Sequence, residues 1–175
     1  LDQDFTRLEI GLKDGVQMPR EVDDERTPDR LALLRRAAAA RQDEGFWMAV
    51  LPFQAGAADQ ALGALAEGLT DDIVTGLSRF SYLRVISRSS SARYATEAHD
   101  IRHVGENLGA RYVMEGSVRQ AGDRVRISVQ LVDGDSGANL WAETYDRSYD
   151  ADAVFDLQDE LVPRVVATVA DMHGV

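Results

Sequence analysis

Short apolar runs alternate with longer amphipathic segments between residues 46 and 169. The first run, residues 47–53, is apolar on both faces, which is expected of a strand buried between two layers. Apolar residues recur every three or four positions across 59–80, which predicts a helix. A second apolar run at 83–88 predicts another strand. Because the order is strand, helix, strand, this part of the chain predicts a βαβ unit with parallel strands.

The hydrophobic pattern changes to a period of two after residue 110. A short helix is expected before this point, at 99–110, with Gly109 as its C-cap. Across 111–145, apolar and polar residues alternate and two Gly-containing turns interrupt them, which predicts an antiparallel meander of three strands with one polar face. A closing helix with a wide apolar stripe is expected at about 152–171. The pattern therefore predicts an α/β fold of three layers, built on a mixed sheet of about five strands.

The residues before the first apolar run have a different pattern, because Gly and Pro interrupt them and acidic residues cluster there. Thr27 is an acceptable N-cap, and Pro28 suits the first position of a helix. Leucines and alanines then form a modest apolar stripe, which predicts a helix at about 28–42. We expect this helix either to dock on the main domain or on a second copy of it, or to be the tail of an upstream domain. We expect an acidic linker region at 1–45 and a folded domain at 46–175.

Composition excludes several classes of protein. The chain has no cysteine, so disulfides and thiolate metal sites are excluded. No apolar run approaches the roughly 20 residues that a membrane-spanning helix needs. A net charge of −11 disfavours nucleic acid as the partner of this piece. Since the chain begins with Leu1 rather than Met, we expect a piece of a longer protein. We expect a cytoplasmic location, or a periplasmic one if a membrane segment precedes this piece.

Charge is distributed unevenly along the chain. Eight arginines stand against five acidic residues between Ser81 and Gln130. The predicted strand at 83–88 leads into a hydroxyl-rich segment of this stretch, and ligands of open α/β sheets gather beyond the carboxyl ends of parallel strands. Guanidinium and hydroxyl groups there would hold an anionic ligand or an acidic partner surface. The alternative is an ordinary solvated turn. The predicted contact residues are Ser87, Arg88, Ser89, Ser90 and Arg93.

No set of residues with catalytic or metal-binding spacing stands out. Asp71 and Asp72 are a candidate acid/base pair, but adjacent residues of a helix point about 100° apart. His99 and His103 are four residues apart, as in many metal sites, but no further ligand completes such a site. We therefore expect no catalytic residue, no metal ligand and no cofactor.

Five segments carry a family resemblance. Their sequences are MAVLPF at 48–53, EGLTDDI at 67–73, VISRSS at 85–90, YVMEGSVR at 112–119 and LWAETYDR at 140–147. In this order they resemble the TolB amino-terminal-like domain of bacterial signalling proteins, over about residues 46–170. The resemblance implies a sheet-and-helix fold of three layers, like that of anticodon-binding domains, and it implies no catalytic residues. Such domains typically lie between tetratricopeptide repeats and an output domain, often an adenylate cyclase or a winged-helix transcriptional regulator.

The resemblance and the pattern together indicate a non-catalytic regulatory or interaction module of a bacterial signalling protein. Such a module binds a small ligand or a partner domain and passes its state to the output. Its expected partners are the attached output domain, the tetratricopeptide repeats or another protein. One alternative is a self-association module, in which two copies bury the closing helix and the 28–42 helix in a homodimer. The other is an enzyme that is part of an adenylate cyclase system, although no acid, base and nucleophile with suitable spacing occur.

Overall fold

The structure is a computed structural model that describes residues 46–56, 60–95 and 99–173, together with positions 32 and 36. The predicted helix at 28–42 lies outside the described residues except at those two positions. The elements are β1 (Phe46–Val50), β2 (Gln54–Ala55), α2 (Gln60–Leu77), β3 (Leu83–Val85), α3 (Arg88–Ser91), the 3-10 turn η1 (Ala92–Tyr94), α4 (Ile101–Leu108), β4 (Tyr112–Ala121), β5 (Arg124–Asp133), β6 (Asn139–Ser148), the 3-10 turn η2 (Ala151–Ala153) and α5 (Val154–His173).

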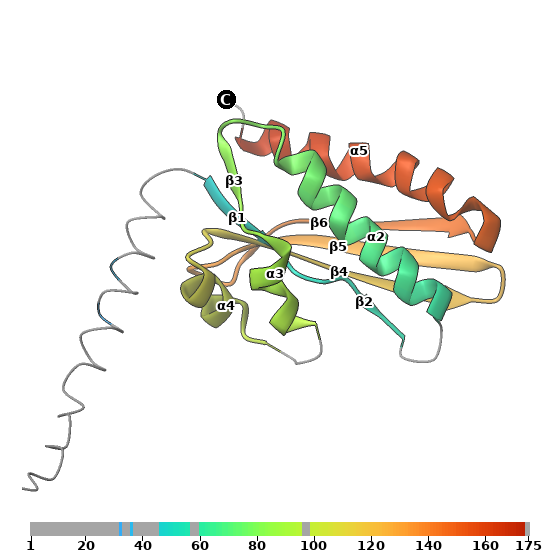
Figure 1. The fold of residues 1–175 in the computed structure, drawn as a ribbon, viewed down its shortest axis with the longest axis horizontal. Coiled ribbons are helices and arrows are strands. Elements are labelled where there is room, and N and C mark those ends of the chain that lie inside the picture. Colours follow the sequence, from blue (N-terminus) through green and yellow to red (C-terminus); the bar gives the residue numbers. More distant parts are fainter. Residues whose placement is uncertain (1–31, 33–35, 37–45, 57–59, 96–98, 174–175) are drawn as a thin grey trace, which may run out of the picture.

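The sheet is mixed, with the strand order β3-β1-β4-β5-β6, and β2 pairs with β4 beside this path. β1 is parallel to β3 and to β4, whereas β4, β5 and β6 form an antiparallel meander. This topology confirms the predicted fold class, including the parallel βαβ unit and the meander. Helices cover both faces of the sheet, which gives three layers (Figure 1).

The predicted strand at 47–53 is shorter in the structure, and a separate short strand follows it. β1 ends at Val50, and the short β2 rejoins the sheet against Ser117 and Val118 of β4. The interruption has two local causes. Pro52 has no backbone N–H to donate to a neighbouring strand, and the N–H of Phe53 donates to the hydroxyl of Thr70 instead.

The larger core lies between the sheet and the two long helices, α2 and α5. α2 is one continuous helix whose apolar stripe faces the sheet, as its three- and four-residue spacing predicts. α5 packs against both α2 and the sheet, and this position accounts for most of its wide apolar stripe. Phe155 is the exception, with 77% of its surface exposed. None of the described helices is both long and apolar enough to cross a membrane.

The second core is smaller and lies on the opposite face of the sheet. α4 and η1 cover that face over β1 and the first residues of β4. β1 therefore has both faces buried, with Met48 and Val50 in the larger core and Ala49 and Leu51 in the smaller one. α4 ends at Gly109, as predicted, in the left-handed conformation with φ 66°. On the same face, none of the described helices covers the polar residues of the meander.

Gly116 of β4 provides a test of packing in the larger core. The Phe53 ring, only 6% exposed, lies so close to this residue that an added Cβ would be 2.4 Å from ring atom Cε2. We expect Gly116→Ala to lower the free energy of unfolding by about 1–3 kcal/mol, because the ring must move within a packed core. Chemical denaturation measures this loss.

The matched control is Gly63→Ala in α2, where a Cβ would meet no heavy atom within 4 Å. Alanine is the better helix former, so this variant should be more stable than the parent by up to about 1 kcal/mol. Equal unfolding free energies for the two variants would contradict the described packing of Phe53.

Candidate functional site

The predicted contact residues lie at the start of the smaller layer, after β3. β3 ends at Val85, earlier than the predicted 88, and the segment expected to be a loop is the short helix α3. Ser87 precedes this helix, and its hydroxyl lies 3.1 Å from the hydroxyls of both Ser89 and Ser90. The three hydroxyls therefore interact mainly with each other and with the local turn.

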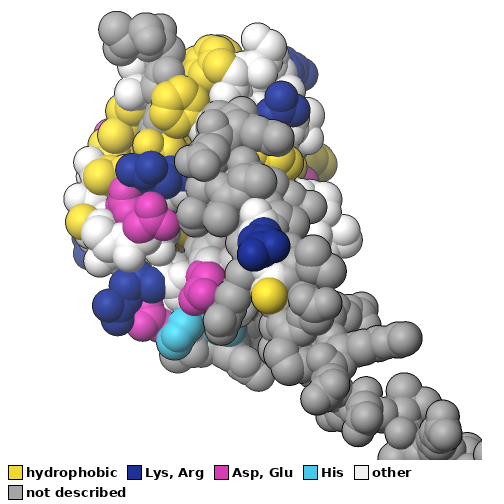
Figure 2. Space-filling view, turned by 90° about the vertical axis from the view of Figure 1, so that its left-hand side faces the viewer, with side chains coloured by type: hydrophobic (Ala, Val, Ile, Leu, Met, Phe, Trp, Pro, Cys, Tyr) yellow, Lys and Arg dark blue, Asp and Glu magenta, His cyan; other side chains and the backbone are white. Residues whose placement is uncertain are grey.

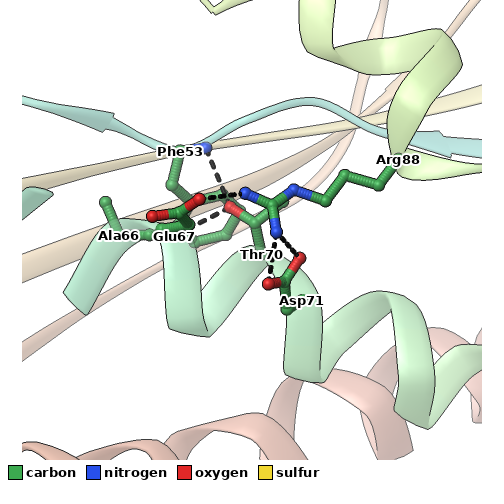
Figure 3. A network of polar contacts seen from close by, with 6 residues as sticks. All are labelled: Phe53, Ala66, Glu67, Thr70, Asp71 and Arg88. Atoms are coloured by element: carbon green, nitrogen blue, oxygen red, sulfur yellow. Dashed lines mark hydrogen bonds and ion pairs between the residues drawn. The ribbon is translucent and has the colours of Figure 1, made fainter. Parts of the chain in front are cut away.

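Arg88 extends away from this cluster to the opposite layer (Figure 3). Its guanidinium donates to the carboxylate of Asp71 and, at 2.6 Å, to Glu67, both on α2. The hydrogen bond to Glu67 is the largest of the contributions that raise the pKa of Arg88. Both carboxylates that bind this guanidinium belong to α2. Arg88 therefore joins α3 to α2 across the carboxyl ends of β1 and β3.

Thr70 holds the same region together from inside, a role that no sequence pattern directly indicates. It is 1% exposed, accepts the Phe53 N–H at 3.0 Å and donates to the Ala66 carbonyl at 2.8 Å. Its position on the apolar stripe of α2, next to Leu69 and Ile73, is the only signal that predicts burial. Thr70 and the Arg88 ion pairs together connect the β1–β2 interruption, α2 and α3 (Figure 3).

Arg93 lies apart from Arg88. Its guanidinium carbon is 5.0 Å from the centre of the Tyr94 ring, a cation–π contact. With Ser89, Ser90 and Asn107 it lines a shallow polar pocket of about 310 Å³. The structure therefore brings Ser89, Ser90 and Arg93 together and separates them from the guanidinium of Arg88. Whether they bind a ligand stays a prediction.

The basic stretch between Ser81 and Gln130 does not form one basic face. Four of its eight arginines are paired with carboxylates, in the pairs Arg88 with Glu67 and Asp71, Arg102 with Asp100, Arg111 with Asp133 and Asp135, and Arg126 with Asp146. Figure 2 shows basic and acidic side chains next to each other on the side of the molecule that carries α4. Carboxylates thus neutralise half of these arginines, which weakens the case for a general anion-binding surface.

One cavity lies on the half of the sheet that the smaller layer leaves uncovered. It is a groove of about 740 Å³ between the η1 segment and the polar face of the meander. We call it the sheet groove. Its lining residues are Leu51, Pro52, Gln54, Tyr94, His99, Glu115, Gly116, Ser117, Ser128, Val129, Gln130, Ala142, Glu143 and Thr144.

Two rows of cross-strand neighbours form the floor of the sheet groove. In one row, Ser117 lies opposite Ser128, whose hydroxyl is 3.3 Å from that of Thr144. In the other, the Gln130 amide donates to the Glu115 carboxylate at 2.7 Å. The floor thus offers hydroxyl, amide and carboxylate groups to a polar occupant.

The wall of the sheet groove is aromatic. The His99 ring meets the Tyr94 ring edge-on at 4.7 Å, and its Nε2 lies 3.1 Å from the Tyr94 carbonyl oxygen. His99 therefore has a structural partner, and His103 does not join it in a metal site. Among the described residues, no three His, Cys, Asp or Glu side chains converge to hold a metal ion.

The alternating polar positions of the meander were the sequence signal for this floor. They predict a polar face but not a groove, because an exposed antiparallel sheet face is ordinarily just solvated. The groove exists because α3, η1 and α4 cover only the β1 half of that face. How far this helical layer extends over the sheet depends on tertiary packing.

The fold and the groove define a three-layer α/β domain with a polar sheet surface beside a helical layer. The chain belongs to the family described as the second domain of HilA/YgeH-like transcriptional regulators, whose family model matches residues 44–164. It is therefore a domain of the regulatory or signalling kind, as predicted. The TolB-like description is not the one this family carries, and it stays a prediction.

A curated relative supports this assignment, and two solved structures resemble the chain more distantly. "Putative adenylate cyclase 3" of Rhizobium meliloti (strain 1021) is 48% identical over 119 residues, which cover 68% of this chain and 20% of that protein. The chain thus spans about a fifth of its relative's length. Lipoprotein GNA1162 from Neisseria meningitidis is 19% identical, with a TM-score of 0.52 over 71% of this chain and 96% of that one.

TolB from Acinetobacter baumannii is 20% identical, with a TM-score of 0.46 over 72% of this chain and 29% of that chain. Such a likeness is too weak to support a conclusion. At its level of identity, the likeness to the Neisseria lipoprotein shows the fold alone.

The ion pairs of Arg88 predict a stabilising role for this residue. We expect Arg88→Ala to lower the free energy of unfolding by up to about 1 kcal/mol, because the three side chains are 38%, 45% and 65% exposed and water screens them. The loss should shrink as salt is added. Denaturant unfolding at low and high salt measures both effects.

The control is Arg93→Ala, for which we expect a change within about 0.5 kcal/mol because no carboxylate pairs with this side chain among the described residues. A loss for Arg93→Ala as large as for Arg88→Ala would contradict the structural assignment of Arg88.

Tyr145 makes β6 sensitive to alkaline pH. Burial, assisted by its hydrogen bond to Glu143 at 2.9 Å, raises the pKa of the Tyr145 phenol to about 12. Since the folded pKa lies above the unfolded value near 10, this contribution to stability is complete below pH about 10 and is lost as the pH rises towards 12. The unfolding midpoint should fall as the pH rises from 9 to about 12. The midpoint of Tyr145→Phe should fall less steeply over the same range. Parallel curves for the two proteins would exclude this linkage.

Proposed function

We propose that this chain is a non-catalytic regulatory module of a bacterial signalling protein. It binds a partner domain or a small ligand and passes that state to an output elsewhere in the full-length protein. The family match supports a regulatory domain, and the finer assignment of binding without catalysis is our inference.

One observation carries the proposal. Residues 44–164 match the second domain of a family of transcriptional regulators, and 68% of the chain matches a fifth of the protein named "Putative adenylate cyclase 3". Transcription and cyclic nucleotide synthesis are different outputs that need different domains. A domain that occurs with both is best explained as a part that controls an output rather than as the output itself.

The sheet groove supports the proposal by offering a place for the controlling contact. Its volume of about 740 Å³ lies within the range of small-molecule sites, and its lining mixes hydroxyl, amide and carboxylate groups with apolar side chains. Ser128 and Thr144 line it and lie opposite each other on neighbouring strands. No described residues form a nucleophile–base pair beside it, which favours binding over chemistry.

The test uses the full-length protein that contains this chain. Ser128→Trp and Thr144→Trp should each fill the sheet groove and change the regulated output, measured as cyclic AMP formation or as reporter transcription. We expect an effect of about fivefold or more, the lower end of usual coupling between sites. The matched control is Thr75→Trp, on the exposed surface of α2 and outside the sheet groove.

An output that neither groove variant changes, with both variants folded, would show that the sheet groove has no controlling role. Turnover of ATP or GTP by the purified chain would contradict the non-catalytic part of the proposal.

A further inference from the structure

β6 is an edge strand of the sheet. It contains ten residues, pairs with β5 on one side, and pairs with no described strand on the other. Long exposed edges present unpaired backbone N–H and C=O groups to other chains, and proteins usually protect them. The described part of the chain places no helix or proline on the outer side of β6 at Ala142–Thr144.

The register shows which backbone groups face outward. The Tyr149 N–H donates to the Asp123 carbonyl at 2.7 Å, in line with the pairing of Arg124 and Ser148. Since successive residues of a strand direct their backbone groups to opposite sides, the odd-numbered residues from Trp141 to Arg147, where the register with β5 is regular, bond to β5. The N–H and C=O groups of Ala142 and Thr144 therefore point away from the sheet.

One end of the edge is already closed. The Arg147 guanidinium donates to the outward carbonyl of Asp146 at 2.9 Å and to Glu160 of α5 at 2.8 Å. This pattern fits the outward direction of the even-numbered residues. It leaves the open part of the edge at Ala142 and Thr144, directly beside the sheet groove that both residues line.

We propose that the sheet groove and the β6 edge together bind an extended, basic segment of a partner protein, which adds to β6 as a further strand. This inference rests on the proposed function and names the kind of partner. Backbone hydrogen bonds to Ala142 and Thr144 provide affinity, and alternate side chains of the segment lie over the sheet groove and provide selectivity.

Charge selects a basic segment. Glu143 is exposed on the edge strand, between the two open backbone positions, and its described hydrogen bond comes from a neutral phenol. Glu115 lies in the floor of the sheet groove. The nearby cations Arg126, Arg147 and Arg164 are already paired, Arg126 with Asp146 and the other two with Glu160. A cationic side chain opposite Glu143 therefore completes a cross-strand pair.

A second copy of this chain fits the edge less well. Antiparallel pairing of two β6 strands that joins Ala142 of one copy to Thr144 of the other places Glu143 opposite Glu143. Like charges directly opposite each other destabilise a pair of strands. Each copy also carries a net charge of −11, so two copies repel each other.

The test measures binding of a ten-residue peptide of alternating Thr and Arg to the 175-residue chain by NMR. We expect shifts at the amides of Ala142 and Thr144 and at groove residues Ser117 and Ser128. The same peptide with alternate backbone nitrogens methylated should bind at least about tenfold more weakly, because it cannot donate to the edge. A peptide with Glu in place of Arg should also bind more weakly.

Variants of the chain provide the second arm. Thr144→Pro removes an outward N–H without breaking a bond to β5, so an edge strand tolerates it. It should bind at least about tenfold more weakly than the control Thr144→Val, which also loses the hydroxyl but keeps the backbone N–H. Glu143→Lys should reverse the preference between the Arg and Glu peptides.

Several results would overturn the inference. Equal binding of the methylated peptide would exclude backbone pairing, even if Thr144→Pro failed to fold. Shifts that map to the Arg93 pocket would place the site elsewhere. A concentration-dependent dimer that Thr144→Pro abolishes would assign the edge to a second copy. If groove variants change the output of the full-length protein but the Thr/Arg peptide does not bind, strand addition is wrong and the regulatory module stands.

Discussion

The burial of β1 on both faces is the constraint on which the rest of this structure depends. Met48 and Val50 require a layer on one side, and Ala49 and Leu51 require a layer on the other. α2 and α5 provide the first layer over the whole length of the sheet. The second layer, made by α3, η1 and α4, is shorter and covers only the β1 end. The polar half of the meander is consequently left open, and the sheet groove lies where the shorter layer ends.

Polar contacts fix the two layers to each other where β1 leaves the sheet. After Pro52 has interrupted the ladder, the Phe53 N–H does not bond to a neighbouring strand. The buried hydroxyl of Thr70 accepts its hydrogen bond instead. Arg88 then connects α3 to α2 through two carboxylates. The polar residues most evident in the sequence thus serve the architecture, and the open surface is formed by less conspicuous Ser, Thr and Gln residues of the strands. Family membership agrees with this division, since a regulatory domain needs a stable scaffold and a separate surface for recognition.

The β6 edge and the sheet groove are adjacent because the meander ends the sheet. A last strand has one free side, and here Ala142 and Thr144 direct their backbone groups to that side while lining the groove. Arg147 closes the edge near the start of α5 by binding both Asp146 and Glu160. A fully exposed edge strand favours aggregation. A surface that accepts an added strand therefore needs one open stretch of edge, with the rest of the edge protected.

The sequence by itself determined the elements whose signals are local. The two-sided apolar run at 47–53, the three- and four-residue spacing of α2 and the alternation across the meander predicted the layers and the strand pairing, because side-chain periodicity follows backbone geometry. It also predicted Gly109 as the C-cap of α4. Tertiary structure decided the rest. The guanidinium of Arg88 faces α2 rather than solvent, Thr70 is buried, and the sheet groove lies over the meander, because each depends on distances between segments far apart in the chain.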